Sequence, residues 1–537
     1  MPDPRDRWGV SPAAARVTWV NDFEGSAVET DSLTGSKGSP TGPPQLKKGA
    51  ISYITNIVIS VASTAPAYSL AATVGFFILT QGVGVHSPAV IIVSFIPMYF
   101  IAAAYNAMNA ADPDCGTTFS WVTRSMGPSL GWVIGWCVIF SDIIVNANQA
   151  DIAGDYGFKL FGLGAASNNT LDVTILGVIF IVLLTWICWR GIELSALTQQ
   201  ILLGFEMAIL VIFAVVALIK AYAGHHPESL HVTLNWFNPF NLSFGSLVEG
   251  MLLGVFLYWG WDTGVSVNEE SENSSSGPGR AALTSTIVLI GIYLLVTVAS
   301  QAYAGTKYLG NNPNDIFAGG LSKDVLGPLH FLLVIAVLTS ATAATQTTIL
   351  PAARSALSMS RRTAIPRQFG EIHPRNLVPG TATIWAGVLS VIWFVFIINV
   401  STNVLGDSVA GLGFLVCIYY GFTGFACTWF YRHRLLNSIS NFVKLGVMPT
   451  LGGLILMGIL VRGAVYYGHE INDYSKPFLK LGVPDWIGIL GVGSGIVFML
   501  IRRVQRVPFF GERTLVAGDH IETVTPEEEF APPDSML

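Results

Sequence analysis

The feature that most constrains this chain is a series of twelve apolar stretches, each about as long as a helix that crosses a bilayer. Only 12% of the 537 residues are charged, about half the share that is usual in soluble domains. The stretches do not alternate as barrel strands do, and a helix pairs its backbone groups within its own segment. The sequence therefore predicts an all-α polytopic membrane protein and excludes the soluble, disordered, collagenous and disulfide-stabilised classes. The expected spans are residues 51–80, 88–110, 128–153, 171–189, 196–220, 245–270, 281–305, 328–350, 382–401, 408–431, 447–467 and 484–501.

The distribution of Lys and Arg predicts how these spans are oriented. With a cytoplasmic N-terminus, 21 of the 28 Lys and Arg residues fall on the inner side and seven fall on the outer side. Inner loops of membrane proteins carry the excess of positive charge, and an even number of spans returns the chain to its starting side. We expect a multi-pass protein of the plasma (inner) membrane, surrounded by the lipid bilayer, with both termini cytoplasmic.

The remaining composition indicates no cofactor and no further domain. Residues 1–46 and those after about 507 are polar and rich in proline, which predicts disordered cytoplasmic tails. The five cysteines form no C-x-x-C pair, and the nine histidines do not cluster at metal spacing. The glycine-rich segments lie inside spans rather than after a strand, so they are not nucleotide loops. We expect no metal, no cofactor, no nucleic acid partner and no enzymatic activity.

Two of the spans are interrupted by residues that disfavour a continuous helix. In the first span, a proline lacks the backbone N–H and clashes with the preceding turn. In the sixth span, two glycines flank an acidic residue at mid-depth. Taken singly, these are also the marks of a proline kink and of a G-x-x-x-G packing face. The first break comprises Ser63, Thr64, Ala65, Pro66, Ala67 and Tyr68, and the second comprises Gly260, Trp261, Asp262, Thr263 and Gly264.

Taken together, the two breaks indicate a transporter. They occupy spans one and six, the same place in two successive sets of five, and broken helices at matching positions of two halves mark a binding site at the membrane midplane. Because five is odd, the second half enters the membrane in the opposite sense to the first. Half-helix ends expose backbone groups and partial charges that a polar substrate can use.

Three further motifs resemble the amino acid–polyamine–organocation (APC) superfamily of permeases, over roughly residues 50 to 505. They are AYNAMNAADPDCGTTFSWVTRSMGPSLGWVIGW between spans two and three, FLYWGWDTGVSVNEES in span six, and PAARSALSMSRRTAIPRQFGEIHPRNLVPG after span eight. The resemblance implies a leucine-transporter-type fold with 12 transmembrane helices and a 5+5 inverted repeat. The implied divisions are 47–220 and 221–440 for the two repeats and 441–506 for two accessory helices, between an N-terminal tail at 1–46 and a C-terminal tail at 507–537.

The first break departs from the family pattern. Family members commonly carry glycines there, whose backbone N–H groups hold a substrate carboxylate, whereas this chain has Ser-Thr-Ala-Pro-Ala. Pro66 donates no hydrogen bond, although the hydroxyls of Ser63 and Thr64 can do so. A polar headgroup other than a carboxylate therefore stays open as an alternative.

Acidic residues inside spans require an explanation, because each costs at least ~2.5–3.5 kcal/mol to insert. Asp142 shares one helix face with Asn146 and Gln149 in span three, at i, i+4 and i+7. We expect this face to line the central cavity, with Asp142 receiving an ammonium group. The alternative is a buried acid that bonds to a neighbouring helix.

Residues of spans five and eight are candidates for ion coupling by resemblance. Glu206 matches a place where some proton-coupled relatives carry a lysine that faces the first span, so its carboxylate is a candidate proton carrier. Otherwise it is a fixed charge that replaces sodium or pairs with a cation. Ser340 and Thr345 lie in the Ser/Thr-rich part of span eight, where sodium-coupled members of the wider fold bind the ion. Helix–helix hydrogen bonding is the competing interpretation.

An aromatic run surrounds the second break. Phe256, Tyr258, Trp259 and Trp261 favour a lid over the substrate or a cation–π face for an amine, with packing as the alternative. By resemblance, Asp262 acts in gating or substrate contact. We expect Glu249 to lie on the access path or at the interface. The remaining candidates are Arg354, Arg361 and Arg362, which we interpret as cytoplasmic gate or headgroup contacts.

These features favour a secondary active transporter of an amino acid or related amine. Asp142, Glu206 and Asp262 supply negative charge with no basic residue beside them in the spans, which predicts a zwitterionic or cationic substrate. We expect coupling to H+ by symport or exchange, with Na+ as the alternative ion. The competing function is a non-transporting nutrient sensor or regulatory subunit. An ion channel fits poorly, because no filter loop or ring of like residues is present.

Overall fold

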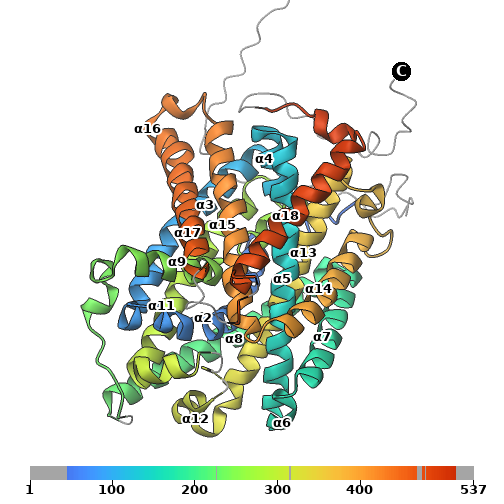
Figure 1. Cartoon of the computed structure of the whole chain (residues 1–537). Coiled ribbons are helices and arrows are strands. Elements are labelled where there is room, and N and C mark those ends of the chain that lie inside the picture. Colours follow the sequence, from blue (N-terminus) through green and yellow to red (C-terminus); the bar gives the residue numbers. More distant parts are fainter. Residues whose placement is uncertain are drawn as a thin grey trace, which may run out of the picture. The chain divides into compact units, whose positions relative to one another are not determined.

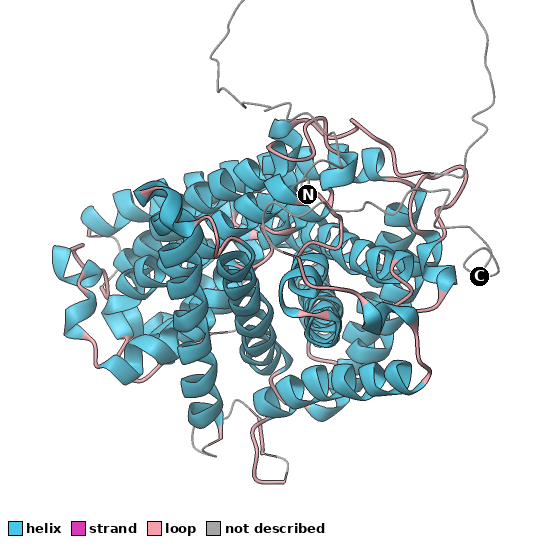
Figure 2. Cartoon of the chain, turned by 90° about the horizontal axis from the view of Figure 1, so that it is seen from above, coloured by secondary structure: helices cyan, strands magenta, loops and turns pink. Residues whose placement is uncertain are grey.

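The computed structural model describes residues 45–515 except 225–226, 314–315, 318, 469–474 and 478, and of residues 192–196 it describes only the backbone. The described chain is built of helices joined by loops (Figure 2). Eleven helical stretches within it are long and apolar enough to cross a membrane. The helices that form them are α1 Tyr53–Thr64, α2 Pro66–Leu79, α3 Ser87–Ala111, α5 Pro128–Leu160, α7 Thr170–Arg190, α8 Ile192–Tyr222, α11 Gly277–Asn311, α13 Phe331–Arg361, α14 Gly380–Val400, α15 Val404–Phe430, α16 Ile439–Asn441, α17 Met448–Tyr467 and α18 Val483–Val504.

The sixth expected span differs from the others because its helix is interrupted. Its first part, α9 (Phe244–Tyr258), has only 15 residues. After it the chain leaves the helix and continues as the single turn α10 (Thr263–Ser266). The all-helical membrane fold is thus confirmed, whereas the count of twelve spans rests on joining α9 and α10 across the break. Short helices connect the spans elsewhere: α4 Thr118–Met126, α6 Gly164–Ser167 and α12 Gly320–Leu326.

Helices α5 and α13 pack side by side in the middle of the bundle, and α7 and α14 pack together beside them (Figure 1). The peripheral helices present apolar faces outward, as a lipid solvent requires. In α7, Ile175, Ile179 and Val182 are more than half exposed and share one face. In contrast, the described side chains of α5 between Ile143 and Ala150 are all buried. The polar residues of α5 therefore face other helices and not the surroundings.

The break in the first span is confirmed at the predicted place. Ala65 adopts the left-handed conformation, with φ 48° and ψ 68°, and Pro66 begins the second half-helix. A non-glycine residue in this region is uncommon. Proline suits the first position of a helix because its missing N–H would have no partner there. In the other break, Gly260 has φ 114°, which glycine adopts without the steric cost of a side chain.

The prediction of disorder after residue 507 is wrong for the first part of that tail. Residues Pro508–Gly511 form a turn of 3₁₀ helix. Phe509 is only 1% exposed and stacks on Phe119 of α4, with the ring centroids 5.7 Å apart. The backbone N–H of Leu515 also donates to the carbonyl of Arg124, at 2.5 Å. An aromatic residue with a hydrophobic partner fixes this segment, which composition alone did not reveal.

Candidate functional site

The two broken helices meet each other. A Cβ placed on Gly260 would lie 2.7 Å from the carbonyl oxygen of Ser63, so only glycine allows this approach. The hydroxyls of Ser63 and Thr263 share a hydrogen bond of 2.8 Å across the same contact. Two segments about 200 residues apart in the chain thus form one junction of non-helical backbone, as the sequence pattern predicted.

The start of α2 is held by a carboxylate from α8. Oε1 of Glu206 accepts a hydrogen bond of 2.6 Å from the backbone N–H of Ala67 and one of 2.7 Å from the hydroxyl of Ser340 on α13. The same Ser340 oxygen accepts from the N–H of Tyr68 at 3.2 Å. A negative group is favoured here, because the first N–H groups of a helix lack partners within it. Glu206 and Ser340 therefore do lie at the first break, where the sequence placed them.

The other carboxylate oxygen of Glu206 is buried and accepts no hydrogen bond within the described part of the chain. The side chain is fully inaccessible, with 0% of its surface exposed. Burying a carboxylate with one oxygen unpaired is costly while the group is ionised. A proton or a bound cation at this oxygen would remove that cost.

The backbone N–H groups of the first break already donate hydrogen bonds within the protein, so they are not available to bind a substrate carboxylate. The N–H of Ala65 donates to the carbonyl of Ala62, and Ala67 and Tyr68 donate as described. The hydroxyl of Thr64, which we expected to be available, donates to the carbonyl of Val61 at 2.7 Å. In the second break, by contrast, the N–H groups of Gly260 and Trp261 make no hydrogen bond among the described residues.

An aromatic cluster of α3, α15 and the second break surrounds Asp262. The hydroxyl of Tyr420 donates to Oδ1 of Asp262 at 2.9 Å, and its ring stacks on Trp261 with centroids 5.1 Å apart. Tyr105 meets Trp261 edge to face at 5.0 Å. The indole N–H of Trp259 donates to the hydroxyl of Tyr419. Sequence reasoning missed these tyrosines; the only signal was an adjacent Tyr-Tyr-Gly in a span.

Asp142 lies within electrostatic reach of this cluster. Its carboxylate lies close enough to that of Asp262 for the two groups to repel each other when both are ionised. The side chain is 2% exposed, and its Oδ2 has no hydrogen-bond partner among the described residues. No Lys or Arg among those residues pairs with Asp142, Asp262 or Glu206, so these three carboxyl groups have no cationic partner in the described part of the chain.

The rest of the expected face of α5 binds neighbouring helices. Asn146 donates to the hydroxyl of Ser390 on α14 at 3.2 Å and accepts from Thr348 on α13. Thr345 donates to the side-chain oxygen of Gln149 at 2.7 Å. The competing interpretation, helix–helix hydrogen bonding, therefore describes Asn146 and Thr345, because α5 and α13 pack along each other. On the α5 face itself, Asn146 and Gln149 thus bind neighbouring helices, where we expected them to line a cavity.

The aromatic residues at the end of α9 divide into two groups. Phe256 meets Tyr68 of α2 edge to face, with centroids 6.2 Å apart, so it joins the two breaks. The side chain of Tyr258 contacts α3 instead, where its hydroxyl donates a hydrogen bond of 3.2 Å to the carbonyl of Ile91. Both rings are buried. Phe256 keeps the position expected of a lid, whereas Tyr258 acts in packing.

A network of ion pairs lies at one end of the helix bundle, and we call this end of the bundle the arginine-rich end. Arg354, only 1% exposed, pairs with fully buried Glu270 through hydrogen bonds of 3.0 to 3.2 Å. Further ion pairs of the network join Arg361 to Glu269 at 2.9 Å, Arg362 to Asp114 at 3.1 Å and to Glu512 at 3.0 Å, and Arg124 to Asp112 at 2.6 Å and to Asp114 at 3.8 Å. They connect the α3–α4 loop, the segment after α10 and the end of α13. The network fits the expected gate.

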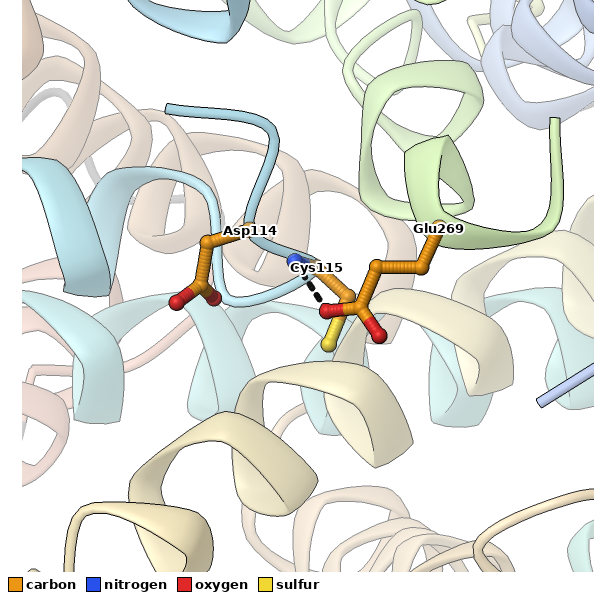
Figure 3. A group of neighbouring side chains, drawn as sticks. All are labelled: Asp114, Cys115 and Glu269. Carbon is orange, nitrogen blue, oxygen red and sulfur yellow. Dashed lines mark hydrogen bonds between the residues drawn. The ribbon is translucent and has the colours of Figure 1, made fainter. Parts of the chain in front are cut away.

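Asp114, Cys115 and Glu269 gather within this network (Figure 3). Each already has a partner from the chain: Asp114 binds Arg362, and Glu269 accepts the N–H of Cys115 at 3.0 Å. Burial alone would raise the pKa of the Asp114 carboxyl, but Arg362 and Arg124 outweigh it and hold that pKa below its usual range. The acids of the trio neutralise arginines, so they are poorly suited to a metal ion.

In the first half of α9, before the second break, Glu249 forms an ion pair with Arg462 of α17, with the nearest carboxylate oxygen and guanidinium nitrogen 2.6 Å apart. The carboxylate is 7% exposed and the guanidinium 44% exposed. Glu249 is therefore the more buried partner of an ion pair whose other member is partly exposed, and its expected place on the access path or at the interface stays a prediction.

Comparison with known proteins agrees with this geometry. Residues 51–504 match the family model described as amino acid permease. A branched-chain amino acid permease of Lactococcus lactis is 23% identical over 52% of this chain and 61% of its own length. An arginine/ornithine antiporter of Latilactobacillus sakei is 21% identical over 80% of this chain and 93% of its own length. A human Asc-type amino acid transporter is 23% identical over 57% of this chain and 59% of its own length.

The chain thus matches less than two thirds of two of these relatives and most of the third. The names of these relatives differ in the amino acid that they specify, so they indicate a class of transporter and not a particular substrate. The family match, however, runs from the first span to the last. On this ground the chain is a multi-pass membrane protein that belongs to the amino acid permease family.

Proposed function

We propose that this protein is a secondary active transporter that moves an amino acid or related amine by alternating access around the joined breaks. The observation that carries the proposal is the contact of Gly260 with Ser63, which places two non-helical segments against each other deep in the bundle. Such segments are tolerated at membrane depth only where protein or a polar cavity surrounds them. Transporters of repeated five-helix halves bind substrate at this place.

The proposed substrate is zwitterionic or cationic. Asp142 and Asp262 supply negative charge, and the neighbouring rings of Trp259 and Trp261 suit a positively charged amine. The unpaired N–H groups of Gly260 and Trp261 are candidates to bind a substrate carboxylate. The acidic side chain of an anionic amino acid would face the carboxylates of Asp142 and Asp262, with which no arginine pairs among the described residues. The names of the relatives, which include neutral and cationic amino acids, are compatible with either choice.

Coupling to protons is proposed to run through Glu206. Its free oxygen is the place for a proton, and its bonded oxygen joins α2 to α13 through Ser340. Protonation would weaken the carboxylate as an acceptor for the N–H of Ala67, because charged acceptors bind more strongly. The hydrogen bonds that join α8 and α13 to the start of α2, the second half of the first span, would then weaken. Sodium coupling through the hydroxyls of Ser340 and Thr345 stays the alternative, since a hydroxyl that donates its hydrogen, as Thr345 does to Gln149, keeps its oxygen lone pairs for an ion.

The arginine-rich end is proposed to be cytoplasmic and to act as the inner gate. This orientation rests on the excess of Lys and Arg there. The ion pairs of Arg354, Arg361 and Arg362 join three segments that must separate for release into the cytoplasm. With this orientation both termini are proposed to be cytoplasmic, and the membrane is proposed to be the plasma membrane.

Counterflow in proteoliposomes tests the transport function. Vesicles are loaded with one unlabelled amino acid at a time, and entry of the same labelled compound is followed, with empty vesicles and Gly260→Ala protein as controls. Saturable entry for a neutral or basic amino acid or an amine is expected. The sensor alternative predicts ligand-induced thermal stabilisation without flux, and that pair of results would replace the transport proposal.

A further inference from the structure

A basic pocket lies at the arginine-rich end, apart from the broken helices. It has a volume of about 380 Å³ and is formed by the end of α13, the segment that follows it and the end of α18. Its lining includes four arginines and no acidic residue. We call it the α13–α18 pocket, and its arginines are Arg361, Arg367, Arg502 and Arg506.

The pocket is held in shape by backbone contacts. The guanidinium of Arg502 donates to the carbonyls of Ala364 at 2.9 Å and Thr363 at 3.2 Å, which ties the end of α18 to the segment after α13. The hydroxyl of Ser360 donates to the carbonyls of Pro366 and Arg367 at 3.0 and 3.2 Å. One wall of the pocket is therefore a fixed loop.

Two of the arginines that line the pocket are exposed to the surroundings. Arg367 and Arg506 are both exposed residues, and Arg506 has φ 55°, a conformation that turns the chain sharply after α18. Guanidinium groups bind phosphate oxygens through paired hydrogen bonds. Arg361 is partly neutralised by Glu269, but with four arginines and no acidic residue among the described lining residues the pocket has an excess of positive charge, which favours a ligand with negative charge on several oxygens.

The surroundings of the pocket favour a membrane lipid as the source of that charge. Along the last turns of α18, Leu500 and Ile501 are about half exposed and Val504 is 82% exposed, so apolar surface continues to the level of the pocket. Acyl chains beside this surface would bring their headgroups to the arginines. Basic pockets between helices on the cytoplasmic side are known to take anionic headgroups.

We propose that the α13–α18 pocket binds the phosphate of an anionic phospholipid headgroup. The ligand would bridge the end of α13 and the end of α18. Arg361 lines the pocket and also pairs with Glu269, so the bound phosphate and the proposed inner gate share a residue. A soluble phosphate compound offers the same chemistry, and the experiment separates the two sources.

The test measures thermal stability of the purified full-length protein in mixed micelles. Phosphatidylglycerol is the anionic probe, phosphatidylcholine the zwitterionic control, and inorganic phosphate and glycerol 3-phosphate are the soluble probes. The pocket variant is Arg367→Gln/Arg506→Gln. The matched control is Arg375→Gln/Arg503→Gln, which removes two charges from exposed residues close in sequence that do not line the pocket.

Phosphatidylglycerol is expected to stabilise the wild type and the control pair, with roughly 100-fold weaker apparent affinity for the pocket variant, since each lost hydrogen bond between a guanidinium and the phosphate contributes about 1.5 kcal/mol. Equal loss in both pairs would overturn the proposal, because general surface charge would then explain binding. Absence of stabilisation by every phosphate probe would also overturn it. Pocket-dependent stabilisation by soluble phosphate at the same concentration would uphold a phosphate site and overturn its assignment to lipid.

Discussion

Replacement of Glu206 by glutamine isolates the role of its charge from its role as an acceptor. The glutamine oxygen can take the place of Oε1 and accept from Ala67 and Ser340, while the amide nitrogen occupies the site of the unpaired oxygen. The variant thus mimics a permanently protonated carboxyl. Glu206→Ala removes both hydrogen bonds and leaves a buried N–H at Ala67, at a cost of about 1–3 kcal/mol in stability.

We expect the Glu206→Gln variant to lose the accumulation of substrate that a pH gradient drives. If one proton accompanies each substrate, a gradient of one pH unit is worth about 1.4 kcal/mol and supports about tenfold accumulation. In the wild type, uptake should fall as the external pH rises toward the internal pH. In Glu206→Gln, accumulation should lose this dependence while counterflow exchange continues. Proteoliposomes with imposed gradients provide both measurements.

The control is Glu272→Gln, because Glu272 is an exposed acid close to the second break in sequence. It should keep the pH dependence in full. If Glu206→Gln keeps that dependence too, the coupling proton does not reside at Glu206. If this variant unfolds or loses counterflow altogether, the carboxylate acts as a structural cap on α2.

Three further changes test the site and the gate. Gly260→Ala places a Cβ 2.7 Å from the carbonyl oxygen of Ser63 at φ 114°, so we expect about 1–3 kcal/mol lower stability and loss of flux, both measurable on the purified protein; normal flux would contradict the close contact. Asp142→Asn should weaken affinity for a cationic amine by roughly 10–100-fold in competition assays, the value of a charge-assisted hydrogen bond, and unchanged affinity for every amine would refute the charge argument. Asp114→Asn leaves Arg362 with one acidic partner fewer and should lower the melting temperature. Because the folded-state pKa of Asp114 is lowered, its stabilisation is present at neutral pH and is lost as pH falls below about 4, so wild type and variant should converge in acid.

Local sequence chemistry accounts for most of what could be predicted about the fold. Long apolar stretches predicted the helices, since lipid leaves the backbone no other partner. Pro66 predicted a break because its ring and missing N–H act on the nearest turn alone. Gly260 and Asp262 likewise predicted the second break. The all-helical membrane fold is therefore confirmed, and the helix of the sixth span ends early at the break that Gly260 and Asp262 predicted.

The candidate site was predictable only in part, because side-chain direction depends on neighbouring helices. Asn146 and Asp142 share a face of α5 in any helix, yet Asn146 binds Ser390 and Thr348 while Asp142 lies near Asp262. Tyr419 and Tyr420 carry no local mark that distinguishes them from packing residues. The docked segment around Phe509 was also missed, since its partner lies in a distant helix.

The sequence by itself determined that this chain spans a membrane through broken helices, and that a few acids lie within it without basic neighbours along the chain. Only the tertiary structure decided what those groups face. Glu206 is joined to the start of α2, and Asp262 to Tyr420, by contacts between residues 139 and 158 positions apart. Helical periodicity determines which residues share a face, whereas the crossing of helices determines what that face meets.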